Sequence, residues 1–535
     1  MVRLSSTDDS QSPPTVHVPR EYNAAHDLLE RNLLAGRGSK LAYLDDTGTY
    51  TYEELARRAS RFTSALTRLG IQMEQRVLLC LLDTIDFPVS YLGCIKAGVV
   101  PIAVNTLLTP SDLEYILLDS RAVAAVVSAS LLPALEPVLG RAPSLRQVLV
   151  SGSSDHRHVS LGAMLDGTPE DHEAVPTTCD DSCFWLYSSG STGPPKGTVH
   201  AHGSLIQTAE LYAKPIAGYS EDDLIFSVSK LPFAYGLGNS LIFPLAVGAT
   251  AVLMAERPTA RAVIERLRRY RPTVLCAVPT AFATLLAQSE LPSREEMRFR
   301  ICTSAGEALP EEVGKRWHAR FGVHILDGIG STEMLHIYLS NRRDEVCYGT
   351  TGRPVPGYDI RIVGEDGRPV SLGEAGELHV RGPSRALCYW NNRPRSSNTF
   401  VGEWMRTGDK YRQRDDGCYV YEGRSDDVFK VSGLYVSPAE VEAVLVGHGA
   451  VLEAAVVAKP DAEGLLKPYA YLVLKPGRSV STRELQDHVK TRLAPYKYPR
   501  WIEFVPDLPK TATGKIQRFK LREMAANSST PTSNH

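Results

Sequence analysis

The stretch Tyr187-Ser188-Ser189-Gly190-Ser191-Thr192-Gly193-Pro194-Pro195-Lys196-Gly197 directly follows an apolar run, Cys183 to Leu186. We expect that run to be a strand that opens into a loop of small residues. Such a loop presents backbone N–H groups and hydroxyls to an oxyanion, and Lys196 adds a positive charge, as phosphate binding requires. It is not a Walker A loop, because Gly193 is followed by two prolines before the lysine. The residue after the lysine is Gly197, where a Walker A loop has Ser or Thr. A flexible surface linker is the alternative interpretation.

Outward from this loop, short apolar runs alternate with helical stretches as far as about residue 350. Thr51 to Leu69 has the apolar spacing of a helix, with Thr51 as its cap. Runs such as Arg76 to Leu82 and Thr273 to Val278 are nearly continuous in apolar residues, which indicates strands buried on both faces of parallel sheets. Beyond Thr350, period-two alternation and Asp-Gly turns indicate a small antiparallel β-subdomain.

A last α+β unit begins near Arg424 and is large enough, at roughly 110 residues, to have a core of its own. We therefore predict an α/β fold with a large N-terminal domain of αβ-layered parallel sheets plus a small antiparallel β-subdomain, and a smaller mobile α+β C-terminal domain. The predicted boundaries are a disordered tail at 1–20, the N-terminal domain at 21–423, a hinge at 424–427, a C-terminal lid domain at 428–525 and a tail at 526–535.

The composition excludes several classes of protein. The 535 residues carry 59 Lys and Arg against 61 Asp and Glu, so the formal net charge of −2 gives no basic surface for nucleic acid. No apolar run approaches the ~18 residues of a membrane span, and the polar N-terminus lacks the apolar core of a signal peptide. Nine scattered cysteines suggest neither a disulfide framework nor a zinc site. We expect a cytoplasmic protein.

A second glycine-rich turn, Asp327-Gly328-Ile329-Gly330-Ser331-Thr332-Glu333, places a hydroxyl beside a carboxylate. Thr332 could donate to a phosphate oxygen, and Glu333 could bind Mg²⁺, a hard cation that prefers oxygen ligands. The alternative is a helix N-terminus that Ser331 caps and whose dipole favours Glu333.

Two further motifs follow. Arg406 to Asp409 precedes Gly423-Arg424-Ser425-Asp426-Asp427, and a buried Asp409 could accept hydrogen bonds from both hydroxyls of a ribose. The Asp426-Asp427 pair could equally be a solvated turn. Near the C-terminus, Pro509 to Ile516 is a glycine-bearing turn that presents Lys515, which taken alone reads as a surface lysine.

The order and spacing of these motifs are more specific than any one of them. Over roughly residues 22 to 524, the sequence resembles the adenylate-forming superfamily of acyl-CoA synthetases, carrier-protein adenylation domains and luciferases. Within it, the sequence is most similar to aryl-CoA ligases of the benzoate-CoA ligase type. The stretches that distinguish it are Phe233-Ala234-Tyr235-Gly236-Leu237-Gly238-Asn239, Thr303-Ser304-Ala305-Gly306-Glu307-Ala308-Leu309-Pro310, Met334-Leu335-His336-Ile337 and Lys430-Val431-Ser432-Gly433.

The resemblance implies a role for each matching position in binding ATP. Thr332 would contact the α-phosphate, Glu333 would hold Mg²⁺, and Lys515 would be the catalytic lysine. Asp426 would be the hinge, and Gly433 would line the tunnel for the CoA thiol. The implied nucleotide-binding residues are Ser188, Ser189, Gly190, Ser191, Thr192, Gly193 and Lys196 around the β,γ-phosphates, Ala305, Gly306, Glu307, Asp327 and Gly328 around the adenine, and Asp409 and Arg424 at the ribose.

The resemblance also implies a flat, largely apolar slot for an aromatic acid. His336 could donate a hydrogen bond to the carboxylate or to a ring substituent, although a satisfied structural histidine is the commoner case. Pro232 and Ala281 stand where benzoate-specific relatives tend to carry larger residues, so Ala281 would leave room for an ortho-amino or hydroxyl group. The implied slot residues are Ala234, Tyr235, Gly330, His336, Ile337 and Ala281.

The implied activity is that of an AMP-forming acid–thiol ligase. ATP, Mg²⁺ and CoA would serve adenylation of benzoate or a substituted benzoate, such as 2-aminobenzoate, and then transfer of the aryl group to CoA. The main alternative is a stand-alone adenylation enzyme that loads an aryl acid onto a carrier protein. An inactive acyl-nucleotide sensor and a P-loop ATPase fit the motifs less well. The expected partners are small molecules, with neither nucleic acid nor membrane, and the sequence leaves open whether a homodimer forms.

Overall fold

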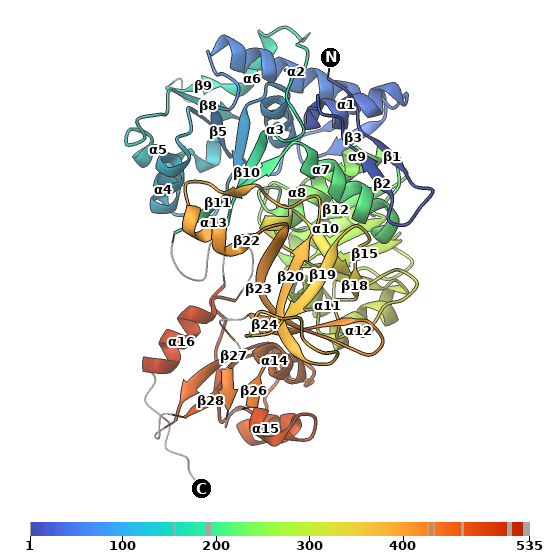
Figure 1. Ribbon diagram of the computed structural model, residues 1–535, viewed down its shortest axis with the longest axis vertical. Helices are drawn as coiled ribbons and strands as arrows, with labels where there is room; N and C mark the ends of the chain where they lie inside the picture. Colours follow the sequence, from blue (N-terminus) through green and yellow to red (C-terminus); the bar gives the residue numbers. More distant parts are fainter. Residues whose placement is uncertain are drawn as a thin grey trace.

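The computed structural model describes residues 2–152, 157–170, 172–188, 194–424, 427, 429–431, 434–461, 465–510 and 516–527. Two large sheets with helices around them form an N-terminal body, an antiparallel sheet packs beside it, and an α+β domain follows at the C-terminus (Figure 1). The predicted α/β class, with a separate C-terminal domain, is confirmed.

The first large sheet has eight strands and contains the glycine-rich loop. Its strands in spatial order are β21 (Cys388–Tyr389), β11 (Lys196–Ala201), β10 (Ser182–Ser188), β6 (Val100–Ala103), β5 (Arg76–Cys80), β7 (Ala124–Ser128), β8 (Gln147–Ser151) and β9 (Val159–Ser160). The helices in this part of the chain are α1 (Ala24–Leu34), α2 (Tyr52–Arg68), α3 (Asp86–Lys96), α4 (Pro110–Ser120), α5 (Leu132–Leu139) and α6 (Leu161–Asp166), with a 3₁₀ turn η1 (Ala129–Leu131).

The sequence predicts the parallel core of this sheet but not its edge. Strands β10, β6, β5, β7, β8 and β9 are parallel, as expected. Strand β11 instead returns antiparallel to β10, with Ser188 opposite Lys196. The connection between them is too short for a parallel crossover, which needs a dozen or more residues. Strands β10 and β11, which flank the glycine-rich stretch, therefore pair as an antiparallel hairpin.

The second large sheet has nine strands and is parallel in its centre. Its strands in spatial order are β18 (Arg353–Pro354), β17 (Ile337–Ser340), β16 (Ile325–Gly330), β15 (Ile301–Ser304), β14 (Val274–Ala277), β12 (Leu224–Ser227), β13 (Thr250–Val252), β3 (Leu41–Leu44) and β4 (Thr49–Thr51). The helical segments are α7 (Gly203–Thr208), η2 (Ala209–Ala217), α8 (Ala234–Leu237), η3 (Gly238–Ile242), α9 (Phe243–Val247), α10 (Ala260–Tyr270), α11 (Pro279–Leu286) and α12 (Glu311–Phe321), with a 3₁₀ turn η4 (Thr332–Met334).

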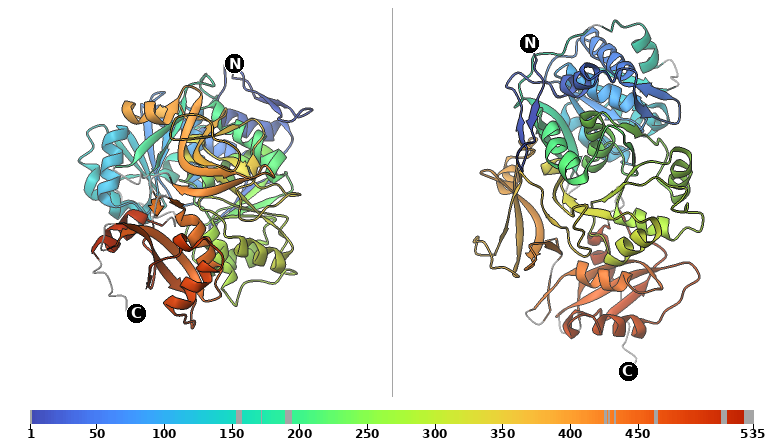
Figure 2. Two further views of the ribbon diagram at one scale, coloured as in Figure 1. Left: turned by 60° about the horizontal axis from the view of Figure 1, so that its bottom comes forward. Right: turned by 90° about the vertical axis from the view of Figure 1, so that its right-hand side faces the viewer.

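The predicted antiparallel subdomain and the C-terminal unit both form. In the right-hand view of Figure 2 the subdomain lies along one flank of the body and the C-terminal unit lies at the lower end. The subdomain consists of β19 (Asp359–Val363), β20 (Ala375–Arg381), β22 (Phe400–Val401), β23 (Trp404–Gln413) and β24 (Tyr419–Arg424), with α13 (Arg393–Thr399) nearby. The C-terminal unit consists of β25 (Phe429–Val431), β26 (Leu434–Val436), α14 (Pro438–Val446), β27 (Val451–Pro460), β28 (Leu466–Leu474), α15 (Thr482–Lys490), η5 (Pro495–Lys497), β29 (Trp501–Phe504) and α16 (Arg518–Asn527).

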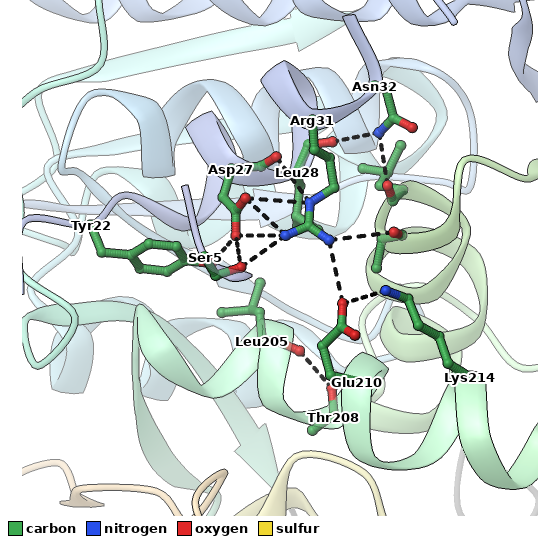
Figure 3. Close-up of polar contacts among 12 residues, drawn as sticks. Ser5, Tyr22, Asp27, Leu28, Arg31, Asn32, Leu205, Thr208, Glu210 and Lys214 are labelled. Carbon is green, nitrogen blue, oxygen red and sulfur yellow. Dashed lines mark hydrogen bonds and ion pairs between the residues drawn. The ribbon is translucent and has the colours of Figure 1, made fainter. Parts of the chain in front are cut away.

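The N-terminal segment differs from its prediction. Residues 1–20 were expected to be disordered, but within them β1 (Ser6–Asp8) pairs with β2 (Thr15–His17). An ion-pair network beside this hairpin explains its order (Figure 3). The hydroxyl of Ser5 donates to Asp27 Oδ2 at 2.6 Å, and Arg31 Nη2 lies 2.9 Å from Asp27 Oδ1. Ser5 is therefore held by hydrogen bonds to Asp27 and Arg31, more than twenty residues further along the chain, and composition does not reveal such contacts.

Arg31 is central to that network, because its Nη1 also lies 3.4 Å from Glu210 of η2. Asp27 is fully buried and Glu210 almost so. No helix among the described residues combines the length and apolar character that a bilayer crossing requires.

Replacing Arg31 with Met should lower the free energy of unfolding by about 3 kcal/mol, because it leaves buried carboxylates without their guanidinium partner. Urea denaturation of both proteins measures this difference. The control is Arg261→Met, which removes a solvent-exposed pair with Glu265 and should leave the free energy nearly unchanged. Equal effects of the two substitutions would show that the Arg31 network does not stabilise the fold.

Candidate active site

One cleft of about 2260 Å³ brings the predicted site residues together. The N-terminal body, the antiparallel sheet and the C-terminal domain all contribute to its walls. Every predicted site residue within the described ranges lines it: Ser188, Lys196, Ala234, Tyr235, Ala281, Ala305, Gly306, Glu307, Asp327, Gly328, Gly330, Thr332, Glu333, His336, Ile337, Asp409 and Arg424. The other predicted residues lie outside the described ranges: Ser189, Gly190, Ser191, Thr192, Gly193, Asp426, Gly433 and Lys515.

One end of the cleft carries an ion pair. Lys196, the first residue of β11, has its Nζ 3.5 Å from Glu333 Oε1. The hydroxyl of Tyr389 joins the two: it donates to Glu333 Oε1 at 2.6 Å and accepts from Lys196 Nζ at 3.2 Å. Burial alone raises the pKa of Glu333, but Lys196 and Tyr389 outweigh it, so the pKa is lowered overall. The carboxylate is therefore ionised at neutral pH.

The turn that carries Thr332 and Glu333 is held at its backbone. Ser331 caps η4 by accepting from the Met334 N–H at 3.3 Å, so the predicted capping role is correct, although the element is one 3₁₀ turn between β16 and β17. His200 Nε2 donates to the Thr332 carbonyl at 2.7 Å, and the Ala386 N–H donates to the Glu333 carbonyl at 2.8 Å. These bonds restrict where both side chains can point.

Leu335, which directly follows this 3₁₀ turn, has a strained backbone conformation. Leu335 has a φ of 64°, a conformation that costs a non-glycine residue of order 1–3 kcal/mol. Such strain persists only where the surroundings over-determine the backbone, and it is typical of functional sites. Gly330, on the facing strand, has no room for a Cβ, which would lie 2.5 Å from the His336 carbonyl oxygen. Strands β16 and β17 therefore approach so closely at Gly330 that a larger residue does not fit there.

A cross-strand pair forms another wall. Asp409 on β23 lies opposite Arg424 on β24, and Arg424 Nη1 is 3.0 Å from Asp409 Oδ1. The Asp409 N–H donates to Thr407 Oγ1 at 3.0 Å. Gly408 between them has a φ of +71°, and a Cβ there would lie 2.9 Å from the Arg424 guanidinium. The motif therefore requires glycine at this position, and it presents a nearly buried carboxylate beside a cation.

Asp327 and the segment after β15 line the cleft between these two walls. Burial raises the pKa of Asp327 well above its ordinary value. Its Oδ1 is buried and makes no hydrogen bond to the described part of the chain. Glu307 accepts from Thr280 Oγ1 at 2.6 Å, which ties the 305–307 segment to α11. This region offers an unused acceptor on a rigid strand end.

The apolar part of the cleft surrounds His336. Its ring centroid lies 4.4 Å from that of Phe243 and 5.5 Å from that of Tyr235, and burial lowers the pKa of His336 to about 3. The ring is therefore neutral at physiological pH. Neither ring nitrogen finds a geometrically sound partner among the described residues. Gly238 leaves the space the ring occupies, because a Cβ there would lie 2.3 Å from it.

Comparison with known proteins places this arrangement. The AMP-binding enzyme model matches residues 29–390, and the AMP-binding enzyme C-terminal domain model matches residues 440–515. The chain belongs to the AMP-binding enzyme family. A benzoate–CoA ligase of Thauera aromatica is 62% identical to this AMP-binding enzyme over 98% of the chain and 100% of its own length. A 4-hydroxybenzoate–CoA/benzoate–CoA ligase of Rhodopseudomonas palustris is 47% identical over 94% of each chain.

Solved structures agree with this assignment. A benzoate CoA ligase from Burkholderia xenovorans superimposes with a TM-score of 0.89 at 55% identity, covering 94% of this chain and 100% of the other. An anthranilate CoA ligase in complex with anthranoyl-AMP gives a TM-score of 0.92 at 41% identity, covering 95% and 98%. The AMP-binding enzyme is therefore an ATP-dependent, AMP-forming acid–thiol ligase of the aryl-CoA type, with ATP and CoA as substrates.

Two residues at the site, Tyr389 and His200, were not predicted from the sequence. Tyr389, in a Tyr-Trp-Asn run, reads as an ordinary core aromatic, and His200 reads as a buried strand residue. The only local signal was the unusual pair His200 and His202 directly after the glycine-rich motif. Their contacts with Glu333 and Thr332 span more than fifty and more than a hundred residues, so no local pattern contains them.

Replacing Tyr389 with Phe should lower kcat/KM for ATP roughly 10–100-fold, the usual effect of removing a hydrogen-bond partner that orients a functional side chain. The ring and its packing stay, and only the hydroxyl between Lys196 and Glu333 is lost. Steady-state kinetics at varied ATP measure the effect. Tyr469→Phe is the matched control, because it removes a hydroxyl that donates to Glu503 in the C-terminal domain. An unchanged kcat/KM in the Tyr389 variant would contradict the positioning role.

Proposed function

We propose that this ligase adenylates benzoate or a ring-substituted benzoate and transfers the aryl group to CoA. The observation that carries the proposal is the slot around His336, which opens into the cleft that also holds Lys196 and Glu333. The relatives support an aromatic acid, since they are named for benzoate, 4-hydroxybenzoate and anthranilate.

The nucleotide would lie along the polar walls. Lys196 and the glycine-rich loop would bind the β,γ-phosphates, and Thr332 would contact the α-phosphate. Asp409 would accept from the ribose hydroxyls while Arg424 holds it in place. The unused Oδ1 of Asp327 would face the adenine edge. The donors and acceptors of Lys196, Thr332, Asp409 and Asp327 in the cleft lining support these assignments, while residues 189–193 lie outside the described ranges.

Glu333 is suited to hold Mg²⁺. Magnesium is usually bound through one or two carboxylates together with substrate phosphates. Glu333 is nearly buried and ionised, and it lies beside the lysine assigned to the phosphates. Mg²⁺ bound there would offset phosphate charge. Lys196 would then exchange its contact with Glu333 for one with phosphate oxygens.

The first half-reaction would be attack of the acid carboxylate on the α-phosphorus of ATP, with pyrophosphate leaving. Negative charge grows on the non-bridging oxygens, so positioned cations and hydrogen-bond donors supply most of the catalysis. We assign these roles to Lys196, Thr332 and Lys515. In the second, the CoA thiol attacks the carbonyl carbon of the mixed anhydride, and AMP leaves.

We further propose that the C-terminal domain turns about Asp426, within the hinge at 424–427, between the two half-reactions. In one pose Lys515 would face the α-phosphate, and in the other Gly433 would line the path of the thiol. Hinges are short stretches that absorb the backbone change. The family match to a separate C-terminal domain supports a boundary before residue 440.

His336 is a polar side chain in the acid slot that could hydrogen-bond to a substituent on the aromatic ring. A neutral His336 with no hydrogen-bond partner among the described residues could donate to a carboxylate or to an ortho group on the ring. Ala281, on α11, lines the same cleft with a small side chain. We therefore include 2-aminobenzoate and 2-hydroxybenzoate among the expected acids.

The test is ATP-dependent CoA-thioester formation with benzoate, 2-amino-, 2-hydroxy- and 4-hydroxybenzoate and medium-chain fatty acids, in wild type and in Ala281→Leu. We expect aryl acids to be preferred. We also expect the leucine to reduce kcat/KM for the ortho-substituted acids about 10-fold or more relative to benzoate, because it fills the space of the substituent.

Benzoate is the internal control of this series. If benzoate and its ortho-substituted forms respond alike, Ala281 does not line the acid slot. A preference for fatty acids would overturn the aryl assignment itself.

A further inference from the structure

Two cysteines and a carboxylate lie close together outside the residues assigned above. The Sγ atoms of Cys347 and Cys418 and a carboxylate oxygen of Asp416 all lie within 4.8 Å of one another. Cys347 follows β17 in the second large sheet, and Cys418 immediately precedes β24 of the antiparallel subdomain. The two thiols therefore meet across the junction of two substructures.

Hydrogen bonds hold the main chain at both cysteines. The Cys347 N–H donates to Asn341 Oδ1 at 2.8 Å, and the Cys418 N–H donates to Asp416 Oδ1 at 2.9 Å. The Tyr419 N–H donates to the Gly352 carbonyl at 2.8 Å, which holds the two segments side by side. The main chain thus keeps the two cysteines on neighbouring segments.

The two thiols differ in their surroundings. Cys347 is half-buried, and Arg414 Nη1 lies 3.7 Å from its sulfur, in position to donate a hydrogen bond to a thiolate. Cys418 is only 4% exposed, and burial, together with the Cys347 sulfur, raises the pKa of its thiol. Arg414 also pairs with Asp416 at 2.8 Å, so a guanidinium already neutralises the carboxylate that a metal ion would need. The surroundings favour thiol chemistry over metal binding.

We propose that Cys347 and Cys418 form a peroxide-sensitive modification site that closes to a reversible disulfide. The Cys347 thiolate attacks one oxygen of hydrogen peroxide, and the O–O bond breaks. The departing hydroxide takes up the proton that the Cys347 thiol released on ionising and leaves as water, so Cys347 becomes a sulfenic acid. The Cys418 sulfur then attacks the Cys347 sulfur, the S–O bond breaks, and a second water leaves with the Cys418 proton. Two thiols and one hydrogen peroxide thus give one disulfide and two waters, and a thiol reductant reverses the step.

The disulfide would act on the cleft through both of its ends. The Thr350 N–H donates to the Cys347 carbonyl at 3.2 Å, and Gly349, Thr350 and Thr351 line the cleft. At the other end, β24 runs from Tyr419 to Arg424, whose guanidinium holds Asp409. Drawing the sulfurs to bonding distance would shift both segments, and this effect on ATP use rests on the nucleotide assignments proposed above.

The experiment treats the full-length enzyme with a small excess of hydrogen peroxide, blocks remaining thiols and maps peptides by mass spectrometry. We expect a linked peptide pair containing Cys347 and Cys418, which disappears on treatment with dithiothreitol. Cys418→Ser should instead accumulate Cys347 sulfenic acid, which dimedone traps. Dimedone adducts on Cys347 in the wild type without any linked peptide would overturn the proposal.

Kinetics of the same samples test the consequence. Oxidation should lower kcat/KM for ATP roughly 10–100-fold, the usual range for an ångström-scale displacement near a reacting centre, and dithiothreitol should restore it. Cys347→Ser should resist the loss, whereas Cys179→Ser, which removes another half-buried thiol, should behave as wild type. Recovery of activity by dithiothreitol is measured on the wild-type enzyme, so this part of the test does not depend on whether a variant folds. If the disulfide-linked enzyme has an unchanged kcat/KM, the proposed effect on the cleft is wrong. Failure of the proposed function would look different, because the reduced enzyme would then make no aryl-CoA.

Discussion

The hydrogen-bonded contact of Lys196, Tyr389 and Glu333 is the interaction on which the site depends. It joins the hairpin of the glycine-rich loop, the edge strand β21 and the turn between β16 and β17. A buried ion pair is costly unless its remaining hydrogen-bonding capacity is met, and breaking one by removing a partner typically costs about 3–5 kcal/mol. The Tyr389 hydroxyl meets part of that need, so the cleft can keep a lysine and a carboxylate together and ionised.

The cleft separates two kinds of chemistry by their surroundings. Around Lys196 and Glu333 it keeps charged groups in the charged state, since neighbours outweigh burial at Glu333. Around His336 it keeps a histidine neutral, since nothing outweighs burial there. Under the proposed function, a charged nucleotide and an aromatic ring would find matching environments in one cleft, as joining a carboxylate to an α-phosphate requires.

Local patterns were sufficient for most elements of the fold. Helix α2 begins after its predicted cap, where Thr51 accepts from the Glu54 N–H. The parallel strands followed from their apolar runs. Local patterns failed where distant partners decide the outcome, as at the N-terminal hairpin held by Asp27 and Arg31, and at the antiparallel return of β11.

The site follows the same division. Lys196, the Thr332-Glu333 turn, Asp409 and Arg424 were predictable as cleft residues because each lies in a short motif that can be recognised in the sequence. Tyr389, His200 and the Cys347–Cys418 pair were not, because their significance lies in contacts that only the folded chain creates.

The central claim is that one cleft performs both half-reactions and that Lys515 serves only the first. The direct measurement compares wild type and Lys515→Ala in two assays: benzoate-dependent exchange of pyrophosphate into ATP without CoA, and benzoyl-CoA formation from supplied benzoyl-AMP and CoA. We predict that the substitution abolishes exchange and leaves thioester formation close to the wild-type rate. Equal loss of both activities would contradict the account.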